Sequence, residues 1–273
     1  MSFGRSMRFE RRQIVAENDH RMAGIDVSMH QSGIRISDTY AEFVFVKATE
    51  GSGYVDPSFH DLANQTLDAG RLLGLYHFAW NSANSVEEEV NTFVEAVRPY
   101  LGQAVLVLDW EDQDGTWDVG WAQAWLEQVT ARTGITPIIY MSASVARAYS
   151  WERVAEGYWL WVAGYPEWAP TYLTTPDCPY APLPHGWWVL AWQYTDAGSI
   201  EGYGGGLDLN VFYRDRTKWK QLANPSGAAD GEELDPAFLS EIAGNLGSLR
   251  YGKEGVRPAG DVIWALDDIR TAL

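Results

Sequence analysis

The sequence predicts an α/β fold, an irregular barrel of eight strands, and two patterns carry this prediction. Up to about residue 160, short apolar runs alternate with amphipathic segments of helical length, which is typical of β/α units around a parallel sheet. Beyond that point the apolar runs continue with no clear helix between them. Eight strands are enough to close a barrel, and the missing helices make its second half irregular.

The expected strands are apolar runs, rich in β-branched and aromatic residues, that are bounded by polar residues or glycine. In chain order they cover residues 24–28, 43–51, 72–80, 104–111, 135–140, 158–163, 188–194 and 207–212. Polar or aromatic side chains stand at the ends of several of them, namely Glu50, Trp80, Glu111 and Tyr140. The carboxyl ends of barrel strands form the face where chemistry occurs, so we expect the functional site there.

Helical spacing of apolar residues predicts four helices between these strands. They cover residues 57–69, 85–97, 121–133 and 144–154. Ser85 is followed three residues later by Glu88, which predicts a capping box at the start of the second helix. Gly70 and Gly134 follow the last periodic residues of the first and third, where helices commonly stop.

Composition divides the chain into three parts. Residues 1–22 form an N-terminal extension of mixed charge, without the apolar core that a secretory signal peptide needs. Residues 23–220 form the barrel, and residues 221–273 form a linker followed by a small helical C-terminal extension. The extension is too short for a sizeable core of its own, so we expect it to pack on the barrel or to mediate self-association.

Composition and charge exclude several classes of function. The formal net charge of −17 argues against a nucleic-acid partner, because phosphate binding requires clustered Lys and Arg. No apolar run approaches the length of a membrane span, so we expect no membrane insertion. Cys178 is the single cysteine, which rules out an intramolecular disulfide, and the five histidines lack metal-ligand spacing. We therefore expect no metal and no other cofactor.

Two acids, Asp109 and Glu111, end the apolar run that begins at Ala104. Residues two apart on a strand point to the same face, so both carboxyls should project together, with Trp110 pointing the other way. Neighbouring carboxylates push their pKa values apart, which gives one proton donor and one anion, the equipment for cleaving a glycosidic bond. A solvated strand end, where acids are common, is an equally good explanation from spacing alone.

The chain has 14 Trp residues, which is a high count. Indole and phenol rings offer flat apolar faces with a hydrogen-bonding edge, and sugar rings match that combination. The candidate sugar platforms at strand ends are Tyr76, Trp80, Tyr140 and Trp192. Packing around the mouth of the barrel explains each of them equally well. For His77, within an apolar strand, we expect a hydrogen-bonded structural role rather than contact with substrate.

Six short motifs resemble those of the glycoside hydrolase family 25 muramidases, the lysozymes of many phage endolysins and of some bacteria and fungi. They occur in the family's order, over about residues 23–212. In this sequence they read Gly24-Ile25-Asp26-Val27-Ser28, Lys47-Ala48-Thr49-Glu50-Gly51, Tyr76-His77-Phe78, Asp109-Trp110-Glu111, Trp192-Gln193-Tyr194 and Asp208-Leu209-Asn210. The segment after Ser28 is a looser match, and the first 22 and last 50 or so residues match nothing in the family.

The resemblance implies a barrel of about five β/α units plus three further strands. It also implies cleavage of the β-1,4 bond between N-acetylmuramic acid and N-acetylglucosamine in peptidoglycan glycan strands. The four active-site acids that it implies are Asp26, Asp109, Glu111 and Asp208, with Glu111 as the general acid. Closure of a barrel would bring Asp26 on the first strand beside Asp208 on the last.

The spacing of Asp109 and Glu111 does not decide whether the anomeric configuration of the product is retained or inverted. Carboxyls at i and i+2 on a strand could lie at the distance that either mechanism requires. We favour a retaining route in which the substrate's own 2-acetamido group attacks the anomeric carbon, oriented by Asp109 or Asp208. An endolysin would stay in the host cytoplasm until release and then act on the bacterial cell wall. The alternatives are a non-catalytic barrel that binds glycan or cell wall, and a virion-associated structural component.

Overall fold

The computed structural model describes residues 21–111 and 118–227, all of which belong to one compact unit, residues 1–230. The predictions for the N-terminal extension and for the C-terminal linker and helices therefore fall almost entirely outside the described residues. The predicted barrel of residues 23–220 lies within them, apart from a short gap.

The described residues form a closed barrel, as predicted. Nine strands pair in the order β1-β9-β8-β7-β6-β5-β4-β2-β3, and a parallel pairing of β1 with β2 closes eight of them into a ring. The strands are β1 (Met22–Val27), β2 (Phe43–Glu50), β3 (Tyr54–Val55), β4 (Leu72–Phe78), β5 (Ala104–Asp109), β6 (Ile138–Ser142), β7 (Leu160–Ala163), β8 (Val189–Ile200) and β9 (Tyr203–Phe212). Only β9 runs antiparallel to its neighbours in the ring, and the short β3 is an edge strand on β2.

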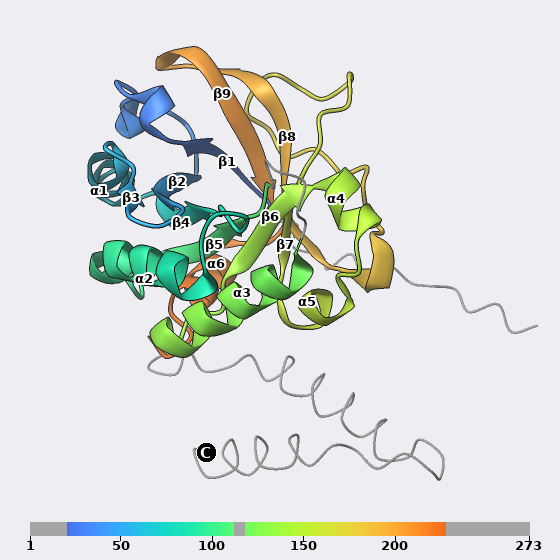
Figure 1. Cartoon of the computed structure of the whole chain (residues 1–273). Helices are drawn as coiled ribbons and strands as arrows, with labels where there is room; N and C mark the ends of the chain where they lie inside the picture. The colour runs from blue at the N-terminus through green and yellow to red at the C-terminus, as the bar shows by residue number, and fades with distance from the viewer. Residues whose placement is uncertain (1–20, 112–117, 228–273) are drawn as a thin grey trace, which may run out of the picture. The chain divides into compact units, whose positions relative to one another are not determined.

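Helices cover the outside of the barrel in its first half, whereas β8 and β9 form a long hairpin in the second half (Figure 1). The helices are α1 (Phe59–Asp68), α2 (Val86–Val97), α3 (Val119–Thr133), α4 (Ala143–Ala148), α5 (Glu152–Gly157) and α6 (Arg216–Ala223). Four short 3-10 turns accompany them at Met29–Gln31, Ile36–Asp38, Arg98–Tyr100 and Pro184–Gly186.

Local signals for helix ends in the sequence are confirmed. Ser85 and Glu88 form the expected capping box at the start of α2, with the Ser85 side chain accepting from the Glu88 backbone N–H. Gly134 ends α3 in a left-handed conformation, with φ of 72°, which glycine adopts at little cost. These ends fix where each helix returns the chain to the next strand.

The prediction of one helix over residues 144–154 is wrong, because α4 and α5 are separate there. Trp151 immediately precedes α5 and is fully buried, and its indole N–H donates to the carbonyl oxygen of Val145. A single continuous helix would not place this ring in the core while its N–H reaches back to α4. The helix α6 was not expected either, because residues 213–223 carry no long apolar stripe.

Alternation along each strand divides the apolar residues into two cores. One set packs between the barrel and its helices, and the other fills the barrel interior. Phe43, Phe45 and Phe212 are in the interior set, together with Trp219 from α6, and their rings contact one another with centroids about 5–6 Å apart. Trp219 donates to the carbonyl oxygen of Leu73, so α6 closes the amino-terminal end of the barrel. The carboxyl ends of the strands remain open for the site.

The large interior rings require small residues opposite them. A Cβ added to Gly74 in β4 would lie 2.1 Å from Cδ1 of Phe45, and one added to Gly24 would lie 2.5 Å from Cε2 of Phe43. Both distances are far below van der Waals contact, so these two glycines leave the volume that the phenylalanine rings fill.

We predict that Gly74→Ala lowers the free energy of unfolding by about 1–3 kcal/mol, the usual cost of overpacking a tight core. Urea denaturation measures this loss. Gly206→Ala is the matched control, because nothing lies within 4 Å of the Cβ that it adds. Equal stabilities of the two variants would contradict the packing of Phe45 against Gly74.

Candidate active site

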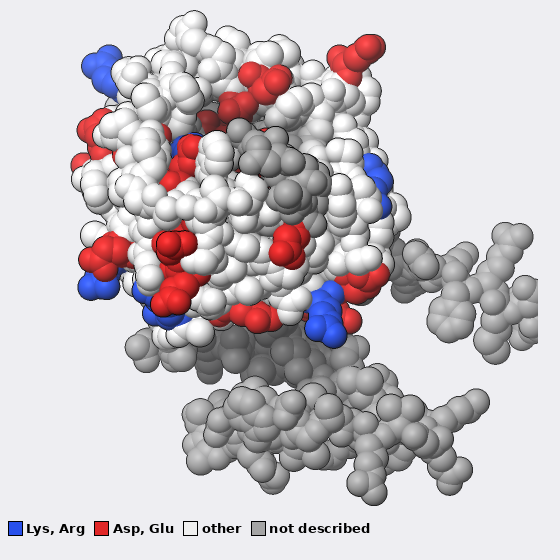
Figure 2. Space-filling model, viewed as in Figure 1, with Lys and Arg blue, Asp and Glu red and all other residues white. Residues whose placement is uncertain are grey.

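A cleft of about 310 Å³ opens at the carboxyl end of the parallel strands. Acidic side chains lie in a hollow of this face (Figure 2). The lining comes from strands all around the ring and from the turn after β1: Asp26, Val27, Ser28, His30, Gln31, Lys47, Tyr76, Phe78, Asp109, Glu111, Tyr140, Trp161, Tyr165, Gln193 and Asp208. All four acids that the sequence predicted therefore share one cleft.

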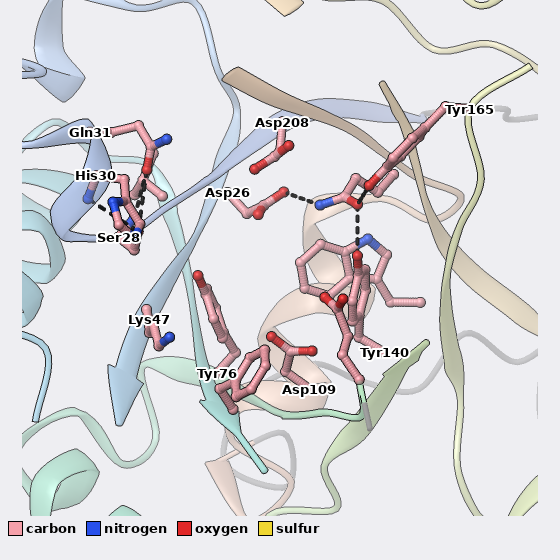
Figure 3. Close-up of a pocket in the computed structure, with 15 residues that line it drawn as sticks. Asp26, Ser28, His30, Gln31, Lys47, Tyr76, Asp109, Tyr140, Tyr165 and Asp208 are labelled. Carbon is pink, nitrogen blue, oxygen red and sulfur yellow. Dashed lines mark hydrogen bonds between the residues drawn. The ribbon is translucent and has the colours of Figure 1, made fainter. Parts of the chain in front are cut away.

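Asp26 and Asp208 lie directly opposite each other across the antiparallel pair of β1 and β9, where the barrel closes (Figure 3). The Asp26 Oδ2 atom accepts hydrogen bonds from Gln193 Nε2 at 2.9 Å and from Asn210 Nδ2 at 2.6 Å. These donors favour the ionised form of Asp26, whereas burial disfavours it. Burial is the larger effect and raises the pKa of Asp26 to about 6.

The Asp208 carboxyl is the partner that keeps its proton longer. Burial, followed by the charge of Asp26, raises the pKa of Asp208 to about 8. A hydrogen bond from the protonated Asp208 to Asp26 adds to this effect. Near neutral pH the two carboxyls therefore hold one proton between them, mainly on Asp208, because two adjacent buried anions repel.

Two tyrosines orient the side-chain amide of Gln193, which faces Asp26. Its Oε1 atom accepts from the Tyr140 hydroxyl at 2.8 Å and also from the Tyr165 hydroxyl. With its oxygen so occupied, the side chain must present its NH₂ group to Asp26. The two tyrosines thus keep an N–H donor directed at Asp26, which favours the ionised form of this carboxyl.

Asp109 and Glu111 form the second pair of acids. Strand β5 ends at Asp109, so Glu111 lies just beyond the strand rather than on it, but the predicted alternation continues. Trp110 points away from the cleft and packs against Trp121 and Trp151, with ring centroids 5.6 and 6.4 Å away. The anchored indole fixes the backbone, so both neighbouring carboxyls face the cleft.

Burial raises the pKa of both acids in this second pair. For Asp109 the pKa lies well above its ordinary value, through burial first and the charge of Glu111 second. For Glu111 burial also raises the pKa, and a hydrogen bond with Tyr140 opposes it. The Asp109 Oδ1 atom is buried and has no hydrogen-bond partner among the described residues. This oxygen is available to a group that enters the cleft.

Lys47 is the cation that faces these acids. Its Nζ atom lies 2.6 Å from Oε2 of Glu50 and 4.7 Å from the ring centroid of Phe78. The other carboxylate oxygen of Glu50 accepts from the indole N–H of Trp80 at 2.8 Å. The ammonium group lowers the pKa of Asp109 and so opposes part of the effect of burial.

The structure brings two of the four predicted sugar platforms to the cleft. Tyr76 and Tyr140 line it. Trp80 does not, because its indole is held at Glu50 beyond the strand end. Trp192 is fully buried on the outward face of β8, where its N–H donates to the carbonyl oxygen of Gly164. Its position beside the inward-facing Gln193 excludes it from the cleft.

His77 has the structural position that was expected. It is fully buried outside the barrel, between Thr49 Oγ1 and Glu89 Oε2, each 2.7 Å from a ring nitrogen. Its ring stacks on Trp125 with centroids 5.3 Å apart. Glu89 also accepts from the backbone N–H of Trp80, so this network fixes the end of β4.

Four residues have roles in the cleft that the sequence did not predict. Lys47, Gln193 and Asn210 were named only as parts of the six motifs, and Tyr165 was not named. Asn210 follows Asp208 at the same i, i+2 spacing that links Asp109 and Glu111, so alternation would have found it. Gln193, between the outward-facing Trp192 and Tyr194, carries the same signal. Tyr165 lies in the irregular segment after β7, where no periodicity applies.

No helix within the described residues is long and apolar enough to cross a membrane. This finding accords with the absence of long apolar runs in the sequence.

Comparison with known proteins gives a consistent result. Residues 25–203 match the model of the glycosyl hydrolases family 25. The chain is 32% identical over 187 residues to the uncharacterized protein YegX of Escherichia coli O6:H1, covering 67% of this chain and 62% of YegX, so it spans less than two thirds of that relative. It is 29% identical to lysozyme M1 of Streptomyces globisporus, covering 79% of this chain and 76% of the lysozyme.

Among solved structures, the bacterial lysozyme of Streptomyces coelicolor is similar. It superposes with a TM-score of 0.61 and 27% identity, covering 75% of this chain and 98% of the lysozyme. The match includes nearly the whole of that protein, so the barrel described above corresponds to a complete solved structure.

We predict that Asp208→Asn makes thermal stability less dependent on pH. The folded-state pKa of Asp208 is raised to about 8 from 3.8, so the folded state binds more protons than the unfolded state between these values. The stability that this proton uptake contributes is therefore fully present below about pH 4, and it is lost as the pH rises through 8. Asparagine removes this proton uptake and keeps an N–H donor for Asp26.

The measurement is the melting temperature of both proteins at pH 5 and pH 9, where the wild type should lose more. Asp68→Asn, at an exposed position on α1, is the control for loss of one charge. Parallel profiles for the wild type and Asp208→Asn would contradict the shared proton.

Proposed function

The chain belongs to the glycosyl hydrolases family 25, a family of glycoside hydrolases, and on this premise we propose that it is a muramidase. In this proposal it hydrolyses peptidoglycan, at the β-1,4 bond between N-acetylmuramic acid and N-acetylglucosamine. One observation carries the proposal from the geometry: three buried or half-buried carboxyls and the exposed Glu111, all with raised pKa values, share one open cleft. A surface that only bound glycan would not need acids that hold protons at neutral pH.

Glu111 is the general acid in this proposal. It is the acid of the second pair that is exposed to solvent, and its pKa is raised above the ordinary value of a glutamate. A glycosidic oxygen must receive a proton as the bond breaks, and a carboxyl in a partly desolvated site can supply it. The hydrogen bond with Tyr140 holds the group at the cleft.

Asp109 is the residue that orients the substrate. Its buried Oδ1 atom lacks a partner among the described residues and can accept the N–H of a 2-acetamido group. Accepting this hydrogen bond favours the ionised form of Asp109, which shifts the proton of the Asp109–Glu111 pair towards Glu111. The acetamido carbonyl oxygen then attacks the anomeric carbon as the glycosidic bond breaks, and the leaving oxygen takes the Glu111 proton. Water, which gives its proton to the Glu111 carboxylate, then opens the cyclic oxazolinium intermediate at the anomeric carbon, so the product anomer is retained.

Asp26 and Asp208 supply charge on the opposite side of the cleft. Asp26 is the more readily ionised member and is fixed by two amide donors, so its negative charge is in place before substrate binds. An oxocarbenium-like transition state carries positive charge, which such a fixed anion stabilises. Between Asp109 and Asp208 as the orienting residue, the free oxygen of Asp109 favours Asp109.

The biological setting follows from the proposed reaction and is a proposal at the same level. Cleavage of glycan strands would lyse bacterial cell walls. The phage-endolysin type that the sequence motifs suggested, with residence in the host cytoplasm until release, stays a prediction.

We predict that Glu111→Gln lowers the release of reducing ends from purified cell walls by about 10²–10⁴-fold, the usual contribution of general acid catalysis. Glutamine keeps the shape of the side chain but cannot donate the proton. Glu87→Gln, at an exposed position in the first turn of α2, is the matched control and should retain full activity.

The possible outcomes separate the alternatives. If the wild type is inert on walls of several compositions, the barrel is a binder or a structural component of a virion. If Glu111→Gln is as active as the wild type, Glu111 is not the acid. An inverted product anomer would rule out the acetamido-assisted route while leaving the general acid in place.

A further inference from the structure

Two tryptophans stand at the end of the barrel opposite the cleft. Trp159 immediately precedes β7 and Trp188 immediately precedes β8, at the amino ends of these neighbouring strands. Sheet hydrogen bonds fix both positions, since the Trp159 carbonyl accepts from Ile139 N at 3.0 Å and the Trp188 carbonyl from Leu160 N at 3.2 Å. Their ring centroids lie 6.4 Å apart with planes at 61°. The Trp188 residue is nevertheless 66% exposed.

Two cations lie against the ring of Trp159. The Lys218 Nζ atom is 5.5 Å and the Arg214 Cζ atom 5.9 Å from the ring centroid of Trp159. Neither cation forms an ion pair with a carboxylate of the described residues. Asp215, between them in sequence, is engaged as the N-cap of α6, where it accepts from the Lys218 backbone N–H at 2.8 Å.

The local charge is unusual for this chain. Residues 213–220 contain four cationic side chains and one acid, in a protein whose formal net charge is −17. Lys218 is half-buried, and burial and the charge of Arg214 both lower its pKa. A partly desolvated ammonium beside a second cation is costly unless an anion or a π-system compensates it. Trp159 and the charge of Asp215 compensate part of this cost.

The exposed indole of Trp188 suits the binding of a sugar ring. Single exposed apolar residues are common and need no explanation, but here the exposed ring of Trp188 contacts Trp159, whose own ring lies against Arg214 and Lys218. An aromatic face accepts the apolar face of a sugar ring, and the adjacent cations accept an acidic substituent on that sugar. Peptidoglycan carries both features, because its strands consist of sugar rings and the stem peptides attached to muramic acid bear carboxylates.

We infer that Trp159, Trp188, Arg214 and Lys218 form a second, non-catalytic binding site for the glycan strand of peptidoglycan. We call these four residues the basal patch. The sugar ring stacks on Trp188, and a carboxylate of the attached stem peptide meets Arg214 and Lys218. This inference rests on the proposed function for its choice of ligand.

The position of the basal patch gives it a role that the cleft cannot fill. The two sites lie at opposite ends of the barrel strands, so they contact different segments of the wall. Binding at both sites raises the effective concentration of the cleft near its substrate. The acid-rich cleft repels a polyanionic wall, and the basal patch supplies attraction at the other end.

The test is pelleting of the full-length protein with insoluble peptidoglycan from which teichoic acids have been removed. All variants carry Glu111→Gln so that the walls stay intact. Trp188→Ala, and separately Arg214→Gln combined with Lys218→Gln, should each weaken pelleting by about tenfold, the effect of removing a central contact residue. The controls, Tyr40→Ala at a 70% exposed aromatic and Arg98→Gln at an exposed cation, should pellet like the parent.

A kinetic experiment separates this inference from the proposed function. With Glu111 intact, Trp188→Ala should leave turnover of a short soluble oligosaccharide of the glycan unchanged and lower turnover of insoluble walls. If the wild type cleaves neither substrate, the proposed function fails, and the pelleting result still decides whether the basal patch binds glycan.

Three results would overturn the inference. The first is unchanged pelleting of both basal-patch variants. The second is a defect that appears only with walls that retain teichoic acid, which would assign the cations to phosphate polymers. The third is loss of thermal stability without loss of pelleting, which would show that the patch packs against another part of this chain.

Discussion

The crowding of four carboxyls at one end of a closed barrel is the constraint on which the rest of the site depends. Closure places β1 against β9, so Asp26 faces Asp208 across a pair of strands at opposite ends of the sequence. Buried carboxylates at such separations cannot all ionise near neutral pH. The site must therefore hold protons, and its neighbouring groups decide which acids keep them.

On one side of the cleft, hydrogen bonds from neutral amides and hydroxyls determine which carboxyl is ionised. Gln193 and Asn210 donate to Asp26, and the hydroxyls of Tyr140 and Tyr165 hold Gln193 in the donating orientation. On the other side, Lys47 favours the ionised form of Asp109, and one oxygen of Asp109 has no partner among the described residues. A hydrogen bond from the substrate to this oxygen would then determine which acid keeps the proton. The cost of burying these polar groups is offset by the dense aromatic packing of the barrel interior beneath them.

Sequence patterns predicted the barrel, most strand positions and the common direction of Asp109 and Glu111, because these depend on alternation. Asp26 and Asp208 were predicted as site acids only by the resemblance to the glycoside hydrolase family. The opposite orientations of Trp110 and Glu111 follow from a period of two and are observed. The placement of Trp192 could not be decided by its strand-end position alone, since it lies on the outward face. The break between α4 and α5 depends on where the Trp151 ring finds space, which is a property of the assembled core.

Direct titration of the carboxyl groups by carbon-13 NMR tests the central claim most closely. The account predicts that the Asp26–Asp208 pair loses its protons in two separate steps, near pH 6 and pH 8, in the protein without substrate. Asp208→Asn should remove the step near pH 8 and leave the Asp26 step near pH 6, because asparagine keeps an N–H donor for Asp26. Titration of both aspartates together near pH 4 would contradict the shared proton and the argument built on it.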